Sequence, residues 1–220
     1  MYAPDEMNGS IIGQYLKETT TRGLHIGCGS HLLSGWLNSD YLPRHKSVLK
    51  LDATEPYPFD NGSFDYVYSE HIIEHVSFEK GKQILRECCR ILKTHGKIRI
   101  STPDLTFLFA LFSEPHSALH SNYIEWATNT FISGAPCYHP TFVINNFMRA
   151  WGHQFVYDET VIRLSLESAG FSQIKRCVLN ASDDPALCNL ENEARMPAGF
   201  LRLESMVFEG TKDIHDPTQP

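Results

Sequence analysis

The chain has 220 residues, with 19 lysines and arginines, 26 aspartates and glutamates, and a formal net charge of −7. This length predicts one domain that can bury a core of its own without disulfides or a structural metal. The acidic balance argues against a nucleic-acid or acidic-lipid partner, because both require a basic face. The 11 histidines are the one unusual count, and they raise the question of a metal.

Nothing in the sequence predicts export or a membrane span. Residues 1–10 lack the basic and apolar regions of a secretory signal, and no stretch approaches the ~18 apolar residues of a span. The cysteines are irregularly spaced and form no C-x-x-C pattern, so we expect all of them to be reduced. They are Cys28, Cys88, Cys89, Cys137, Cys177 and Cys188. We therefore predict a cytoplasmic protein.

The expected elements begin with a short helix over Ile11–Lys17. Short apolar runs that end in polar or glycine residues then predict strands. These strands are expected at Leu24–Ile26, Trp36–Ser39, Ser47–Leu51, Phe64–Tyr68, Lys97–Ile100, Gln173–Val178 and Leu201–Glu209. Residues 1–10 and 211–220 are expected to be loose tails.

Two helices are predicted between strands. Apolar residues recur at helical spacing from Ile84 to Leu92, with Ser77 as the N-cap and Gly96 as the stop. Another helix is expected over Glu159–Ala169, preceded by the N-cap Asp158. Strand–helix–strand alternation implies parallel crossovers, and hence an open α/β sheet that binds ligands beyond the carboxyl ends of its strands.

The helical, aromatic-rich region 105–150 interrupts this alternation. We expect it to form an inserted cap on a single domain that spans residues 1–220. Five of its aromatic residues could stack on a sugar or could instead form the core of the cap. They are Tyr123, Trp126, Phe131, Tyr138 and Phe147.

Polar residues at the predicted strand ends are the site candidates. After the first strand, Gly27-Cys28-Gly29 allows a tight turn and the close approach of a ligand, but Leu32 stands where the dinucleotide fingerprint has its third glycine. Asp40 ends the second strand and could accept both hydroxyls of a ribose. Asp52 ends the third strand and could accept a hydrogen bond from an exocyclic amine. Each is also an ordinary turn residue, so it is their order along the sheet that favours a site.

These features, together with residues 58–67, 74–76, 85–93 and 96–100, resemble class I S-adenosylmethionine-dependent methyltransferases. The resemblance covers residues 22–104. Residues 151–158 and 169–171 resemble a subgroup with a shortened first crossover, whose members are often encoded beside glycosyltransferases. The resemblance implies a Rossmann-like, mostly parallel seven-stranded sheet flanked by helices, with S-adenosyl-L-methionine as cofactor and a small-molecule or sugar/glycan acceptor.

The resemblance also implies residue roles. The glycine turn would lie against the methionine part of the cofactor, the carboxylate ending the second strand would hold the ribose, and the residues ending the third strand would meet the adenine. The implied cofactor-binding residues are His25, Gly27, Cys28, Gly29, Asp40, Asp52, Ala53, Ser69, Glu70 and His71. The family usually has an acidic residue at the position of His25, and often a glycine at that of His31.

Methyl transfer is a displacement at a sulfonium methyl, so the protein mainly aligns the acceptor and excludes water. A hydroxyl acceptor would also benefit from a general base. His71 is the first candidate because it follows the fourth strand. His153 is the second because it lies where the cap rejoins the core. Either could instead be a structural histidine.

Two other functions are consistent with the sequence. The departures at His25 and His31 would suit a catalytically degenerate module that binds the cofactor without transferring a methyl group. His71-x-x-Glu74-His75 matches a zinc-peptidase signature, for which Glu125 would be a distant third ligand. That motif needs a longer helix than the alternation allows, so we predict no metal.

Overall fold

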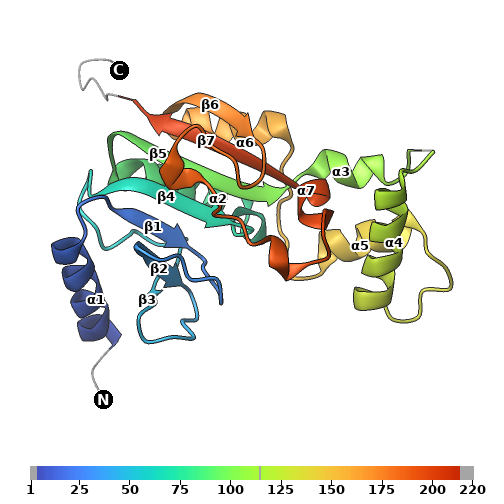
Figure 1. Ribbon diagram of the computed structural model, residues 1–220, viewed down its shortest axis with the longest axis horizontal. Helices are drawn as coiled ribbons and strands as arrows, with labels where there is room; N and C mark the ends of the chain where they lie inside the picture. The colour runs from blue at the N-terminus through green and yellow to red at the C-terminus, as the bar shows by residue number, and fades with distance from the viewer. Residues whose placement is uncertain (1–3, 114, 214–220) are drawn as a thin grey trace.

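Seven strands form one sheet in the order β3-β2-β1-β4-β5-β7-β6 (Figure 1). This computed structural model describes residues 4–113 and 115–213, except for the side chains of residues 4–7. The strands are β1 (Gly23–Ile26), β2 (Trp36–Asp40), β3 (Leu49–Lys50), β4 (Phe64–Glu70), β5 (Leu92–Pro103), β6 (Phe171–Cys177) and β7 (Ser205–Lys212). Only β7 runs antiparallel to its neighbours β5 and β6.

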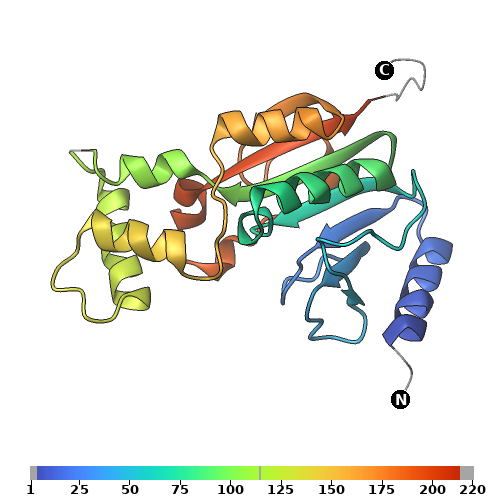
Figure 2. The ribbon, with the colours of Figure 1, turned by 180° about the vertical axis from the view of Figure 1, so that it is seen from behind.

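Helices cover one face of the sheet and extend beyond one end. They are α1 (Pro4–Glu18), α2 (Phe78–Ile91), α3 (Leu105–Ala110), α4 (Ala118–Phe131), α5 (Pro140–Arg149), α6 (Glu159–Ser168) and α7 (Phe200–Glu204). Seen from behind, α2 and α6 lie across the same face (Figure 2). The parallel strands point toward α3, α4 and α5, so the carboxyl ends of the strands face these helices (Figure 1).

The main core forms where α2 and α6 meet the sheet. Ile84, Leu85 and Cys88 of α2 are at most 3% exposed and pack with strand residues such as Val67. Full burial of each such aliphatic side chain contributes about 1.5–3 kcal/mol. Ser77 accepts a hydrogen bond from the Lys80 backbone at the start of α2, as predicted.

The region from α3 to α5 has a separate apolar cluster. Phe107, Tyr123, Val143 and Phe147 are buried in it, and Phe200 of α7 joins them from the other end of the chain. The helices therefore pack on one another beside the carboxyl ends of the strands, and α7 connects them to β7.

The second face of the sheet is crossed by the segment between β6 and α7, residues 178–199 (Figure 1). Its Leu187 and Leu190 are buried against Tyr68 of β4. Two short 3-10 turns, Pro185–Leu187 and Glu193–Arg195, interrupt this segment.

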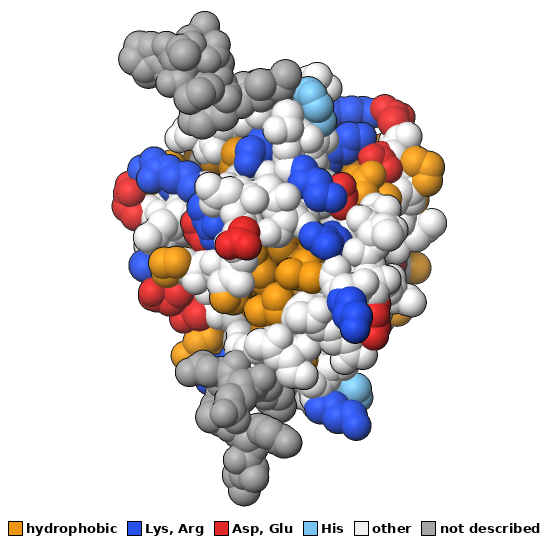
Figure 3. Space-filling model, turned by 90° about the vertical axis from the view of Figure 1, so that its left-hand side faces the viewer, with side chains coloured by type: hydrophobic (Ala, Val, Ile, Leu, Met, Phe, Trp, Pro, Cys, Tyr) orange, Lys and Arg blue, Asp and Glu red, His pale blue; other side chains and the backbone are white. Residues whose placement is uncertain are grey.

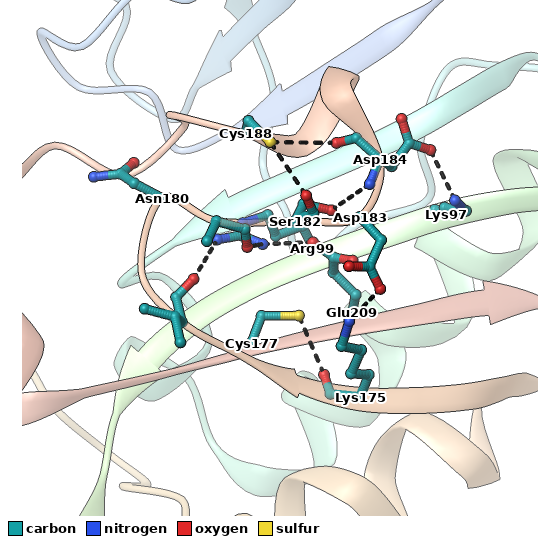
Figure 4. A network of polar contacts seen from close by, with 12 residues as sticks. Lys97, Arg99, Lys175, Cys177, Asn180, Ser182, Asp183, Asp184, Cys188 and Glu209 are labelled. Atoms are coloured by element: carbon teal, nitrogen blue, oxygen red, sulfur yellow. Dashed lines mark hydrogen bonds and ion pairs between the residues drawn. The ribbon is translucent and has the colours of Figure 1, made fainter.

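A buried cation on β5 anchors that segment. Arg99 is fully buried, and its guanidinium donates to Glu191 at 2.6 and 2.9 Å and to Glu209 of β7 at 2.5 Å. It also donates to the backbone oxygens of Val178 and Ala181. Figure 4 shows Arg99 and Glu209 of this network beside residues of the segment.

Further contacts hold the middle of the same segment against the sheet. Lys97, two residues before Arg99 on β5, binds Asp184 at 2.8 Å, and the Cys188 thiol lies 3.4 Å from the Ser182 oxygen (Figure 4). These contacts fix a stretch that has little regular secondary structure.

The predicted element boundaries differ from the structure at both ends of the chain. The first helix begins at Pro4, so residues 4–10 are not a loose tail, and β7 continues to Lys212. Residues 1–3 and 214–220 lie outside the described part. The predicted strand Leu201–Glu209 was wrong over its first half, because Phe200, Leu201 and Glu204 are buried at helical spacing in α7.

Two further boundaries were also misplaced. The helix after Ser77 ends at Ile91 and not at Gly96, because Leu92 already begins the long strand β5. The third strand is reduced to two residues, Leu49–Lys50.

In the described residues, no helix combines the length and apolarity that a membrane crossing requires. The end of the molecule opposite α3–α5 carries interspersed basic and acidic side chains around a small apolar area, so this face is not uniformly basic (Figure 3).

We predict that Arg99→Leu lowers the free energy of unfolding by about 3–5 kcal/mol, because the substitution leaves two inward-facing carboxylates without their cation. Urea denaturation measures the change. Lys82→Gln is the matched control, since it breaks an ion pair with Glu79, whose side chain is 78% exposed, and should cost less than about 1 kcal/mol. Equal losses in the two variants would contradict the anchoring role of Arg99.

Candidate active site

The register of three strands brings the predicted cofactor residues to one edge. Ile26 at the end of β1 pairs with Ser39 of β2 and with Ser69 of β4. The next residues along these strands are Gly27, Asp40 and Glu70, and they therefore lie at the same edge of the sheet. This explains how residues far apart in the sequence come to adjoin one cavity.

That cavity has a volume of about 250 Å³ and lies beyond β1 and β4. It contains six of the predicted cofactor-binding residues, namely His25, Gly27, Cys28, Gly29, Glu70 and His71. Its remaining lining residues are Ser30, His31, Ile72, Asn192 and Arg195. We call it the cofactor cavity below. Asn192 and Arg195 come from the segment that Arg99 anchors, and no sequence pattern indicated them.

Gly27 is required at its position for two reasons. Its φ is +71°, and a Cβ atom there would lie 2.0 Å from the Ile72 Cδ1 atom. The turn therefore passes directly beneath the loop after β4. Any larger residue would push Ile72 away or change the turn.

Asp40 supports this turn directly. Its Oδ2 accepts the Gly29 N–H at 2.9 Å and its Oδ1 accepts the Leu42 N–H at 2.8 Å. Each oxygen retains acceptor capacity for a ligand hydroxyl. Asp40 therefore adjoins the cofactor cavity through Gly29.

The other predicted cofactor residues lie apart from this cavity. Asp52 accepts hydrogen bonds from the backbone and hydroxyl of Thr54, and Ala53 lines a separate hollow beside α2. Ser69 is 4% exposed and is not among the lining residues. The structure brings these three residues near the same sheet edge but not into the cavity itself.

His25 stands where the resembled family usually has an acidic residue, and it does not supply a charge there. It is 1% exposed, and its Nδ1 lies 3.1 Å from the Asn38 amide oxygen. Burial lowers the pKa of His25 to about 4, so its ring is neutral at physiological pH.

A second pocket, also of about 250 Å³, lies between the strand ends and α4–α5. Aromatic residues form much of its wall, namely Tyr123, Trp126, Phe131, Phe147 and Trp151. Its polar lining residues are His71, His75, His153, Arg195 and Glu204. We call it the aromatic pocket. The predicted base candidates His71 and His153 both line it, whereas Tyr138 lines a different cavity.

His71 lies where the two cavities meet. Its φ of +51° is unusual for a residue other than glycine, and it turns the chain sharply after β4. Its Nε2 lies 2.8 Å from the Ser205 hydroxyl and its Nδ1 lies 3.2 Å from Glu74 Oε1. The ring is therefore held between a hydroxyl and a buried carboxylate.

Glu74 is fully buried beneath the histidines. Burial favours the protonated form, but the contacts with His71 and His75 outweigh it and lower the pKa of Glu74. Its backbone oxygen accepts the N–H groups of Gln154 and Phe155, so the chain leaving the cap is fixed next to it.

Two polar residues of the aromatic pocket were missed by the sequence reasoning. Glu204 is 5% exposed, accepts the Tyr123 hydroxyl at 2.5 Å and lies 3.7 Å from Arg195. The sequence predicted a strand at Glu204. The helical spacing of Glu204 with Phe200 and Leu201 was the signal that could have indicated a helix there.

The zinc-peptidase arrangement does not form. His71 follows β4 directly and Ile73–His75 is a single 3-10 turn, so His71-x-x-Glu74-His75 is not on an α-helix. Glu125, the suggested third ligand, lines a different cavity beyond α4.

Comparisons with known proteins agree with this geometry. The family described as "Methyltransferase domain" matches residues 38–100. A SAM-dependent methyltransferase from Archaeoglobus fulgidus is similar in structure, with 16% identity and a TM-score of 0.52 over 96% of this chain and 95% of that chain. A possible exported protein from Bordetella parapertussis has 12% identity and a TM-score of 0.51, over 95% of this chain and 68% of that one. No curated protein matches the sequence.

The chain shares its fold with the S-adenosylmethionine-dependent methyltransferase named above, and residues 38–100 match the methyltransferase model. These findings support a methyltransferase whose cofactor is S-adenosyl-L-methionine. The predicted Rossmann-like, mostly parallel seven-stranded sheet with flanking helices is confirmed.

We predict that Glu204→Gln stabilises the protein at neutral and alkaline pH but not in acid. Burial raises the pKa of Glu204, although His71, Tyr123 and Arg195 oppose the shift. A carboxyl with a raised folded-state pKa favours folding in acid and loses that contribution as pH rises through the folded pKa. The amide keeps an oxygen for the Tyr123 hydroxyl but has no charge to bury.

Thermal unfolding at about pH 8 and about pH 3, on either side of the ordinary carboxyl range, measures this difference. The variant should melt above the parent at the higher pH, and the two should melt together at the lower pH. An equal shift at both pH values would show that packing, and not ionisation, is responsible.

Proposed function

We propose that the chain transfers a methyl group from S-adenosylmethionine in the cofactor cavity to a hydroxyl of a small sugar or glycan acceptor in the aromatic pocket. One observation carries the proposal: His71 and Arg195 line both cavities. A donor on one side and an acceptor on the other would therefore meet beside His71.

The residues of the first cavity fit the cofactor. At Gly29, which lines the cavity, nothing lies within 4 Å of the place of a Cβ atom, so the backbone there is open to a ligand. Asp40, at the adjoining strand end, offers carboxylate oxygens to the ribose hydroxyls, and Glu70 offers a carboxylate at the end of β4. When bound, the cofactor supplies an electrophilic methyl group on a sulfonium.

His71 is proposed as the general base. A hydroxyl already lies at hydrogen-bonding distance from its Nε2, since Ser205 Oγ is 2.8 Å away in the free protein. In the proposed reaction the Ser205 side chain rotates away, the acceptor hydroxyl replaces it as the partner of Nε2, and the hydroxyl gives its proton to Nε2. Glu74, 3.2 Å from Nδ1, would stabilise the resulting imidazolium.

The walls of the aromatic pocket support a sugar-like acceptor. Rings such as Trp126 and Trp151 provide apolar surfaces, while Glu204 and Arg195 provide an acceptor and donors for hydroxyl groups. This combination of ring faces and a few convergent polar groups suits a ligand with one apolar face and several hydroxyls. The helices α4 and α5 would exclude water from the reacting atoms.

We expect S-adenosylhomocysteine to bind with micromolar to submillimolar affinity. Asp40→Ala should weaken binding at least tenfold, or about 1.4 kcal/mol, because the ribose loses its carboxylate partner. Calorimetry measures the affinity, and circular dichroism checks that the variant is folded. Asp60→Ala, at an exposed loop position, is the matched control and should bind as the parent does. No detectable binding to the parent protein would contradict the proposal.

His71→Gln should lower the turnover number at least about a hundredfold, the usual scale for loss of a general base, with less than a threefold change in S-adenosylhomocysteine affinity. Release of S-adenosylhomocysteine in the presence of a panel of monosaccharides, glycosides and nucleotide sugars measures turnover.

The control for this substitution is His45→Gln, which alters an exposed histidine that is not among the lining residues of either cavity. Unchanged turnover in His71→Gln would exclude His71 as the base. Cofactor binding in the parent without turnover on any acceptor of the panel would favour the binding module over the enzyme that transfers to sugars.

A further inference from the structure

We propose that Glu74, His75 and His153 form a binding site for a divalent cation of the zinc type in the wall of the aromatic pocket. One ligand atom from each of these residues lies within 4.8 Å of the other two. Two imidazoles and one carboxylate are a donor set that zinc commonly takes. Binding of the cation does not depend on the proposed methyl transfer.

His153 is oriented as metal-binding histidines usually are. Its Nδ1 lies 2.8 Å from the Phe147 backbone oxygen. A ring that donates Nδ1–H to a carbonyl keeps Nε2 unprotonated and able to ligate.

Glu74 provides a buried oxygen that is incompletely satisfied. The side chain is 0% exposed, and Oε2 accepts the Thr102 hydroxyl at 3.2 Å, whereas Oε1 has no well-aligned hydrogen-bond donor. Oε1 lies 3.2 Å from His71 Nδ1 and 3.9 Å from His75 Nε2. A buried carboxylate oxygen retains acceptor capacity for a cation on its His75 side.

His75 completes the set from the pocket side. Its side chain is 35% exposed, and its ring packs edge to face against that of His153 with centroids 4.9 Å apart. Ligands at 2.0–2.1 Å in a tetrahedron lie about 3.3 Å from one another. Closing the present spacing to that value requires only small rotations of His75 and His153, whose rings line an open pocket.

Three protein ligands leave a fourth position, which would face the aromatic pocket because His75 and His153 both line it. Zinc sites with an open position bind water or a substrate oxygen there. Under the proposed function, that oxygen would belong to the acceptor. This role, unlike the binding of the cation, rests on the methyl transfer.

The site differs from the peptidase motif that the sequence suggested. His71 is not a member, because it is engaged by Ser205 on the other side of Glu74. The third ligand is His153, which lies at the exit of the cap. It is not a second histidine four residues away on the same helix, as in the peptidase motif. The turn at Trp151 and Gly152, with φ values of +57° and +79°, brings it there.

The test is zinc binding by the full chain after removal of metals with a chelator, measured by competition with a chromophoric chelator and without any cofactor. We expect one zinc ion per chain in the parent protein. His75→Ala and His153→Ala should each weaken binding at least tenfold. His45→Ala, which changes an exposed histidine bonded only to Ser47, should bind as the parent does.

Two further measurements separate a built site from surface binding. Co²⁺ should give the visible absorption of a low-symmetry site in the parent and in His45→Ala but not in His153→Ala. Zinc should raise the melting temperature of the same two proteins only, because a ligand stabilises the state that binds it. The absence of stoichiometric zinc in the parent, or equal affinities in all four proteins, would overturn the site. Either result would leave the S-adenosylhomocysteine experiment unaffected.

Discussion

A guanidinium buried between two carboxylates determines where much of the site lies. Arg99 holds Glu191 and Glu209 and two backbone oxygens, and so fixes residues 178–192 across the open face of the sheet. The residues that follow, Asn192 and Arg195, then reach the cofactor cavity. The cost of burying the charge is offset only while both carboxylates and the backbone partners are in place. The sheet core would form from apolar burial alone, but the wall of the cavities would not.

Sequence patterns predicted the sheet, the caps at Ser77 and Asp158, and the edge at which the ligand residues gather. These features depend on local periodicity and on the rule that parallel strands share a carboxyl edge. The wall made by residues 178–204 was not predictable in this way. Its residues 178–199 have no helical or strand period beyond two short 3-10 turns, and Arg99, which holds them, lies 79 to 92 residues away along the chain. The alternation of residues around Glu204 predicted a strand. In the structure Phe200, Leu201 and Glu204 are buried at helical spacing, and the stretch is the helix α7.

In the candidate site too, some residues are positioned by the local sequence and others by contacts with distant parts of the chain. The stretch from His71 to His75 puts one carboxylate and two histidines close together along the chain, which a motif can reveal. That His153 joins them depends on the backbone oxygen of Glu74, which accepts the N–H groups of Gln154 and Phe155. The motif His71-x-x-Glu74-His75 therefore contains two members of the proposed cluster, Glu74 and His75, but gives no sign of the third, His153. The same carboxylate lies beside His71, so one buried charge influences both the proposed base and the proposed cation site.

The contact between Gly27 and Ile72 has a consequence for how the two cavities communicate. Ile72 lies on the glycine turn, and its chain neighbours are His71 on one side and the turn carrying Glu74 on the other. Where the two cavities meet, their common wall includes His71, and Ile72 is the next residue on the side of the cofactor cavity. A ligand that displaced Ile72 would therefore pull on the backbone that positions the His71 ring.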